Sequence, residues 1–166
     1  MGFNNGWLTR SATYMFKDHV LPKPGSILYV KLVGIPLSFL GTPEHTGIYV
    51  GDNRIVELNG NGNIISVSLK GFLDYGSLTR MGLFAYVACD QYGNVLHDSS
   101  IAQRAKGMVG TTRSYNVIFD NCHQFTSGCM TGEYENTDNF FWMLEETIKR
   151  HFGVNKISWR VCAELK

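Results

Sequence analysis

A cysteine at the start of an expected helix is the residue of this chain best suited to covalent chemistry. Cys122 follows Asp120 and Asn121, whose side chains are typical helix caps. A free thiol has a pKa of about 8.5, and a helix N-terminus or a nearby imidazole favours the reactive thiolate. His45 begins an expected strand earlier in the chain and supplies such an imidazole. These residues predict a thiol nucleophile with a histidine base, acting through an acyl-thioester.

Glu57 completes the expected catalytic group. The segment 45–59 holds two β-rich runs around a Gly-Asp-Asn sequence at 51–53, which favours a tight hairpin turn. Pairing of the two runs brings the Glu57 carboxylate near the imidazole N–H of His45. We therefore predict Cys122 as nucleophile, His45 as general base and then acid, and Glu57 as the group that orients the imidazole.

Acyl transfer also needs hydrogen-bond donors for the oxyanion, and removal of one donor typically costs about 3 to 4 kcal/mol. The backbone N–H of Cys122 is the first candidate, because the first N–H groups of a helix have no acceptor within it. Tyr49 and Asn121 are the candidates for a second donor, from a side chain.

A small antiparallel sheet packed against helices, which is an α+β fold, would position these residues. The pattern of apolar residues and turns indicates both kinds of element. The expected strands are 26–33, 45–50, 54–59, 64–69, 83–89 and 156–163. The expected helices are 7–19, 101–109, 122–130 and one that follows a cap at 137–139 and ends at 151.

Composition excludes several classes of protein. The chain has 166 residues, 44% of them hydrophobic, which fits one compact domain over 1–166. A net charge of +1 without a run of Lys or Arg argues against nucleic acid as a partner. The four cysteines lack the paired Cys/His spacing of a zinc site, so we expect neither a metal nor another cofactor.

The apolar residues bear on location and on membrane contact. No stretch reaches eighteen apolar residues and no signal-like N-terminus is present, so we expect a cytoplasmic protein without a transmembrane segment. Delivery to another cell is left open. Leu37, Phe39 and Leu40 in an expected loop are candidates for contact with a membrane surface or an acyl chain. The apolar run 140–144 is another, although such a run at a helix start more often belongs to the core.

The candidate residues lie in motifs that resemble those of one family. The segment His45–Arg54, which reads HTGIYVGDNR, resembles the first motif of the lecithin:retinol acyltransferase (LRAT) family. The segment Asn121–Phe125 resembles the family's Asn-Cys-Glu-His-Phe motif. The similarity covers roughly residues 22–132 and leaves 133–166 as an extension with a helix and a strand.

The resemblance implies a circularly permuted papain-like (NlpC-type) fold, in which the histidine precedes the cysteine. It also implies a thiol acyltransferase or hydrolase, which takes an acyl group from an ester, often a phospholipid, and passes it to an alcohol, an amine or water. By position, His45 matches the family's first histidine and Cys122 its nucleophile. Glu57 stands where the acyltransferases usually have a second histidine, and a carboxylate there also orients and charges the base.

The sequence departs from the family pattern in two further places. His123 and Gln124 replace the Glu-His that follows the cysteine in the family motif. The C-terminal membrane-spanning helix of many animal members has no counterpart in this sequence. The expected substrate is therefore a small acyl ester, a lipid or a peptide, without a choice among them.

Two other interpretations stay open at this point. The same triad would serve a papain-like amidase or peptidase that acts on peptide or cell-wall amide bonds. The chain would otherwise be a non-catalytic binding module on the same scaffold. In that case Cys122 would react with iodoacetamide no faster than Cys89, Cys129 or Cys162.

Overall fold

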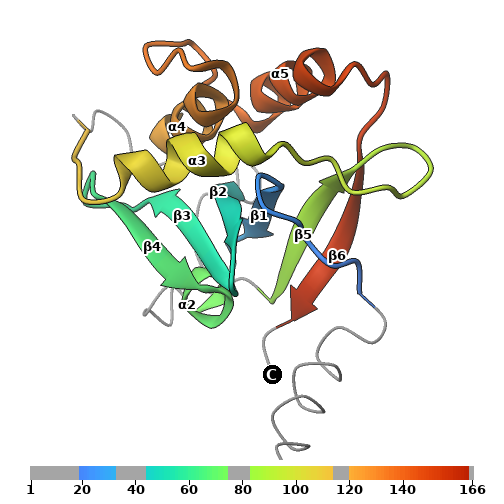
Figure 1. The fold of residues 1–166 in the computed structure, drawn as a ribbon, viewed down its shortest axis with the longest axis horizontal. Coiled ribbons are helices and arrows are strands. Elements are labelled where there is room, and N and C mark those ends of the chain that lie inside the picture. The colour runs from blue at the N-terminus through green and yellow to red at the C-terminus, as the bar shows by residue number, and fades with distance from the viewer. Residues whose placement is uncertain (1–18, 33–43, 75–82, 114–119, 165–166) are drawn as a thin grey trace, which may run out of the picture.

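A six-stranded antiparallel sheet forms the centre of the protein, with the strand order β4-β3-β2-β1-β5-β6 (Figure 1). The computed structural model describes residues 19–32, 44–74, 83–113 and 120–164. The strands are β1 (Ile27–Lys31), β2 (Glu44–Gly51), β3 (Arg54–Leu58), β4 (Ile64–Ser68), β5 (Phe84–Cys89) and β6 (Ser158–Glu164). The helices within these ranges are α2 (Leu69–Leu73), α3 (Ser99–Met108), α4 (Asp120–Thr131) and α5 (Phe141–Phe152).

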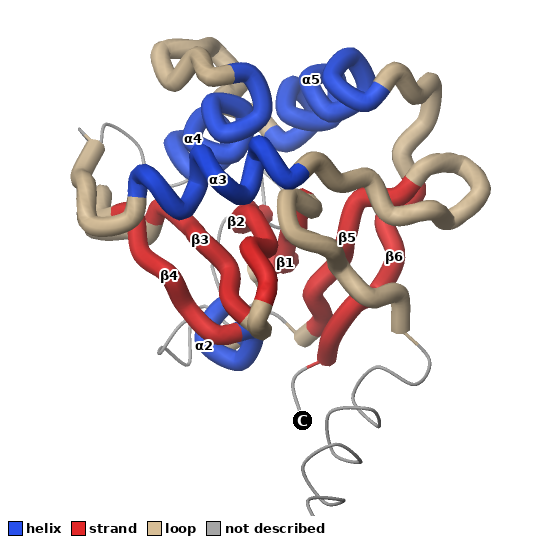
Figure 2. The backbone as a smooth tube through the Cα atoms, viewed as in Figure 1, coloured by secondary structure: helices blue, strands red, loops and turns tan. Residues whose placement is uncertain are grey.

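Helices cover both faces of the sheet. Figure 2 shows α3, α4 and α5 together on one side, with α2 on the opposite side. Each side buries its own apolar cluster: residues such as Ile48 and Phe125 lie beneath the three helices, whereas Ile55 and Phe72 lie on the α2 side. The predicted α+β fold with a small antiparallel sheet is thereby confirmed.

The predicted hairpin is formed by β2 and β3. Its turn places Asp52 and Asn53 in the left-handed region, with φ values of 49° and 56°. Asp and Asn tolerate this conformation better than other non-glycine residues, and it suits the tight turns that join antiparallel strands. The pair Ile48 and Val56 sets the register of the two strands. Extending that register by one position puts Glu57 opposite Gly47.

Gly47 is a point of close approach between β2 and the layer beneath it. A Cβ at this position would lie 2.6 Å from Cγ2 of Ile55 and 3.1 Å from Cε2 of Phe72. Side chains on a strand alternate between faces, so His45 and Gly47 share the face that carries Ile55. The missing side chain of Gly47 leaves the diagonal path between His45 and Glu57 open.

Local structure departs from the expectations at the ends of several elements. α4 begins at Asp120, which the sequence predicts as a cap that precedes the helix. The run expected to be a strand through residue 69 ends at Ser68, whose side chain instead accepts a hydrogen bond from Gly71 N and caps α2. α5 begins only at Phe141, and its N-cap residue Phe140 makes no side-chain capping hydrogen bond. Residues 137–139 do not cap it, because Asp138 accepts hydrogen bonds from the hydroxyls of two buried residues, Ser127 and Thr147.

The structure bears on two of the expectations about apolar segments. In the part of the chain that it describes, each helix is too short or too polar to cross a bilayer. Leu37, Phe39 and Leu40 lie outside the described residues, as does nearly all of the helix expected at 7–19.

Candidate active site

Cys122 lies in the first turn of α4, where that helix meets the beginning of β2. The residue is only 2% exposed, and its Sγ is 4.0 Å from the carbonyl oxygen of Glu44. The hydroxyls of Thr46 and Thr126 hold α4 against β2 through a hydrogen bond of 3.0 Å. The N–H groups and the dipole of a first helical turn favour negative charge on the sulfur.

His45 and Glu57 form a buried pair beside the thiol. Nε2 of His45 is 2.9 Å from Oε2 of Glu57, and both side chains are almost fully buried. An ionised carboxylate can only accept a hydrogen bond, so Nε2 is the donor and Nδ1 is the ring nitrogen left for the thiol. The imidazole also lies against Phe72, with 5.4 Å between ring centroids. These contacts fix the orientation of the ring.

Burial and the neighbouring charges act in opposite directions on each of the two catalytic candidates. Burial opposes the charged imidazolium. The charge of the Glu57 carboxylate, and the hydrogen bonds that the ring donates to Cys122 and Glu57, outweigh burial and raise the pKa of His45 to about 10. Burial likewise opposes the thiolate, yet the charges and hydrogen bonds of His123 and His45 hold the pKa of Cys122 well below its ordinary value. Both shifts favour the thiolate form of Cys122 and the imidazolium form of His45.

His123 is a residue of the site that the sequence analysis treated only as a departure from the family motif. Its Nδ1 is 3.8 Å from Sγ of Cys122 and 3.3 Å from the hydroxyl of Thr46. Its ring lies against Phe141 of α5, with 5.8 Å between centroids. Adjacency to the nucleophile was the available signal, but it does not reveal that the ring turns toward the sulfur.

Tyr49, one of the two side chains predicted as oxyanion donors, does not join this group. The Tyr49 hydroxyl accepts a long hydrogen bond of 3.4 Å from Asn53 N in the hairpin turn. Tyr49 lies four residues along β2 from His45, which is about 13 Å at strand spacing. The structure therefore does not bring its hydroxyl to the thiol as an oxyanion donor. Asn121 lies in the first turn of α4, but its side chain is outside the described part of the structure.

The remaining cysteines are ordinary buried thiols. Burial raises the pKa of Cys89, and it raises the pKa of Cys129 and of Cys162 to about 12. All four cysteines are buried, and none of them is in a disulfide in the structure. Differences in reactivity among the four cysteines will therefore reflect the ionisation of each thiol more than its exposure to solvent.

Cys122 is expected to be the first cysteine that iodoacetamide labels. Because its pKa is lowered, we expect its labelling rate to change by less than about threefold between pH 6 and pH 8, whereas an ordinary thiol gains nearly tenfold per pH unit in this range. Peptide mass spectrometry after limited labelling measures both quantities. Labelling of Cys129 at an equal rate, or a rate for Cys122 that rises tenfold per unit, would contradict the ion pair.

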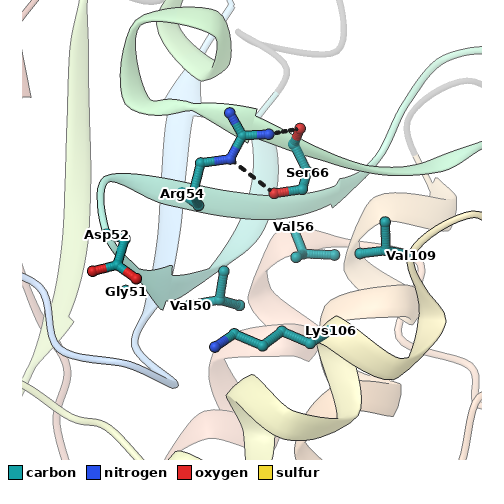
Figure 3. A pocket seen from close by; sticks show the side chains of 8 residues that line it. All are labelled: Val50, Gly51, Asp52, Arg54, Val56, Ser66, Lys106 and Val109. Atoms are coloured by element: carbon teal, nitrogen blue, oxygen red, sulfur yellow. Dashed lines mark hydrogen bonds between the residues drawn. The ribbon is translucent and has the colours of Figure 1, made fainter.

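A pocket lies at the other end of β2. It has a volume of about 320 Å³ (Figure 3). Its lining residues are Val50, Gly51, Asp52, Arg54, Val56, Ser66, Lys106 and Val109. Its nearest lining residue on β2, Val50, is five residues from His45, which corresponds to about 17 Å at strand spacing. None of the catalytic candidates lines it. Among the described residues there is also no cluster of His, Cys, Asp or Glu that could hold a metal ion.

The fold and the site together define a class of protein. A helix N-terminus presents a buried cysteine to a histidine on a strand of an antiparallel sheet, and a carboxylate holds the histidine. The sequence model of the family described as lecithin retinol acyltransferase matches residues 22–135. The chain belongs to this family, whose α+β fold is consistent with the papain-like fold. A comparison with curated proteins found no match.

Family membership indicates acyltransferase or acyl hydrolase activity in general, in a family that acts on lipid substrates. The matched region begins before β1 and ends after α4, and it includes Cys122, His45 and Glu57. It does not include α5 and β6, which are the later part of the chain.

Proposed function

We propose that the protein is a cysteine-dependent acyltransferase or acyl hydrolase that works through an acyl-thioester on Cys122. The observation that carries this proposal is the buried chain of contacts from the thiol through the imidazole of His45 to the carboxylate of Glu57. The pKa of Cys122 is lowered, whereas burial raises the pKa of the other three cysteines. This difference also argues against a non-catalytic binding module.

The first half of the reaction transfers the acyl group to the protein. The Cys122 thiolate attacks the carbonyl carbon of an ester, and a C–S bond forms. The C–O bond of the ester then breaks, and the leaving oxygen takes a proton from an imidazolium at the site. The backbone N–H of Cys122, in the first turn of α4, is the main-chain donor proposed for the oxyanion.

The second half returns the site to its starting state. An alcohol, an amine or water gives a proton to the neutral imidazole and attacks the thioester carbon. The C–S bond breaks, and the thiolate forms again beside the imidazolium. Glu57 keeps the ring of His45 in one orientation throughout, because its carboxylate stays hydrogen-bonded to Nε2.

An ester of lipid type is the substrate class that family membership favours. An amidase or peptidase remains the second candidate, because the same nucleophile and base serve amide cleavage when the leaving nitrogen is protonated. The two differ in the bond that acylates Cys122. Peptide and cell-wall amides are therefore the comparison substrates.

The test uses matched esters and amides that carry the same acyl group. The protein is incubated with a nitrophenyl ester, a phospholipid and the corresponding acyl amide, and the acyl-enzyme is trapped by acid and measured by intact mass. We expect a mass increase of one acyl group from the esters, located on the Cys122 peptide, and at least about 10²-fold slower acylation from the amide. Faster acylation by the amide would favour the amidase, and no acylation by any substrate would contradict the proposal.

A further inference from the structure

The thiol of Cys122 lies beside two imidazoles. The first, His45, comes from β2 and is tied to a carboxylate. The second, His123, is the next residue of α4, and its Nδ1 approaches Sγ at 3.8 Å. Neighbouring residues of a helix point about 100° apart, so the contact requires the ring to turn back toward the sulfur.

Two neighbouring elements hold His123 in that orientation. Thr46 of β2 places its hydroxyl 3.3 Å from the same Nδ1, and it is itself hydrogen-bonded to Thr126. Phe141 of α5 packs against the ring, with 5.8 Å between ring centroids. His123 is 3% exposed, so this arrangement is part of the packed interior. Packing alone does not require the ring nitrogen of His123 to contact the sulfur of Cys122.

We propose that His123 is the proton donor to the leaving group, whereas His45 remains bound to Glu57 as the permanent positive partner of the thiolate. This inference rests on the proposed function and deepens it. In acylation, Sγ forms its bond to the carbonyl carbon, the C–O bond breaks, and the leaving oxygen takes the proton from Nδ1 of His123. In deacylation, the neutral Nδ1 accepts the proton of the incoming alcohol or water.

The groups that face His123 explain why it can release a proton during acylation of Cys122. Burial opposes its charge, whereas the Cys122 thiolate, through its charge and a hydrogen bond, supports that charge and raises the pKa of His123. The neighbouring charge of His45 acts against it, and Glu44 supports it. From α5, the uncharged ring of Phe141 lies against His123.

Formation of the thioester removes the negative charge of Cys122, which is one of the groups that affect the pKa of His123. The sulfur becomes neutral, so the main support for a charged His123 is lost, while burial and the positive charge of His45 still favour release of the proton. His45 behaves differently, because the Glu57 carboxylate keeps its charge in the acyl-enzyme. An acid with a pKa of about 10 is also poorly matched to proton transfer near pH 7.

The experiment compares two leaving groups on the same acyl chain. A nitrophenolate leaves without a proton, whereas the alkoxide of an alkyl ester needs one. For His123→Gln we expect acylation by the alkyl ester to fall by roughly 10²-fold or more, and acylation by the nitrophenyl ester by less than about fivefold. His97→Gln makes the same change at an exposed histidine and is expected to alter neither rate.

Equal losses with the two esters would overturn the inference, because a purely structural role does not depend on the leaving group. If His123→Gln does not fold, Thr46→Val removes the hydroxyl that holds Nδ1 and keeps the imidazole. We expect the same selective loss in that variant, at roughly tenfold. No selectivity in Thr46→Val would then count against the proton transfer.

Alkylation of Cys122 needs no acyl substrate and separates this inference from the proposed function. If the wild-type protein forms no acyl-enzyme with either ester, the proposed function fails, and the inference depends on the pH profile of iodoacetamide labelling. We expect His123→Gln to move the midpoint of that profile upward by about one pH unit, which is a tenfold slower labelling below the midpoint. An unchanged midpoint would overturn it.

Discussion

Cys122→Ser is expected to lower acyl-enzyme formation by at least about 10⁴-fold, which is the size of loss that follows removal of a catalytic nucleophile. A serine hydroxyl keeps the shape of the side chain, but His45 and His123 do not ionise it as they ionise the thiol, because its pKa is far higher. Single-turnover acylation by an ester, followed by intact mass, measures the loss. His45→Gln should cause a loss of similar size, since the thiolate loses its charged partner.

The two substitutions act on one unit, so their effects are not additive. The double variant Cys122→Ser with His45→Gln is expected to be no more than about tenfold worse than either single variant. Cys129→Ala is the matched control, because Cys129 is a buried cysteine of the same helix whose pKa is raised to about 12. Acylation that persists in Cys122→Ser, or that disappears in Cys129→Ala, would place the nucleophile elsewhere.

Glu57→Gln carries the second largest expected effect, a loss of roughly 10²- to 10⁴-fold in acylation. The amide has nearly the same shape as the carboxylate, but it is neutral and can offer an N–H where His45 needs an acceptor. Because the Glu57 carboxylate raises the pKa of His45, its removal lowers that pKa. The imidazolium is then lost at lower pH, and the pKa of Cys122 rises.

The pH dependence of Cys122 labelling checks this prediction independently of turnover. The midpoint of the profile should move upward in Glu57→Gln, with the far-ultraviolet circular dichroism spectrum unchanged. Glu57→His is a useful second variant, because the acyltransferases of the LRAT family that this sequence resembles usually have a histidine at the matching position. We expect it to retain more activity than Glu57→Gln. An unshifted midpoint in Glu57→Gln would show that the carboxylate does not charge the base.

The sequence alone determined the parts of the site that depend on short stretches of chain. The turn at Asp52 and Asn53 fixes a hairpin, and a hairpin brings two residues twelve positions apart, His45 and Glu57, within a hydrogen bond of each other. Polar residues and apolar periodicity predict Cys122 near a helix start, although α4 begins at Asp120, which the sequence predicts as a cap. Most strands could be predicted for the same reason, because alternation and turn residues are local signals.

Only the tertiary structure decided which side chains meet the sulfur. The contact between His123 and Thr46 joins residues 77 positions apart, and it depends on how α4 is rotated against β2. Tyr49 illustrates the converse, since it belongs to the correct motif but lies too far along the strand to reach the thiol. The start of α5 likewise follows from Asp138, which is held by hydroxyls of α4 and α5. The physical reason is that packing between distant segments sets such contacts, and no local propensity encodes it.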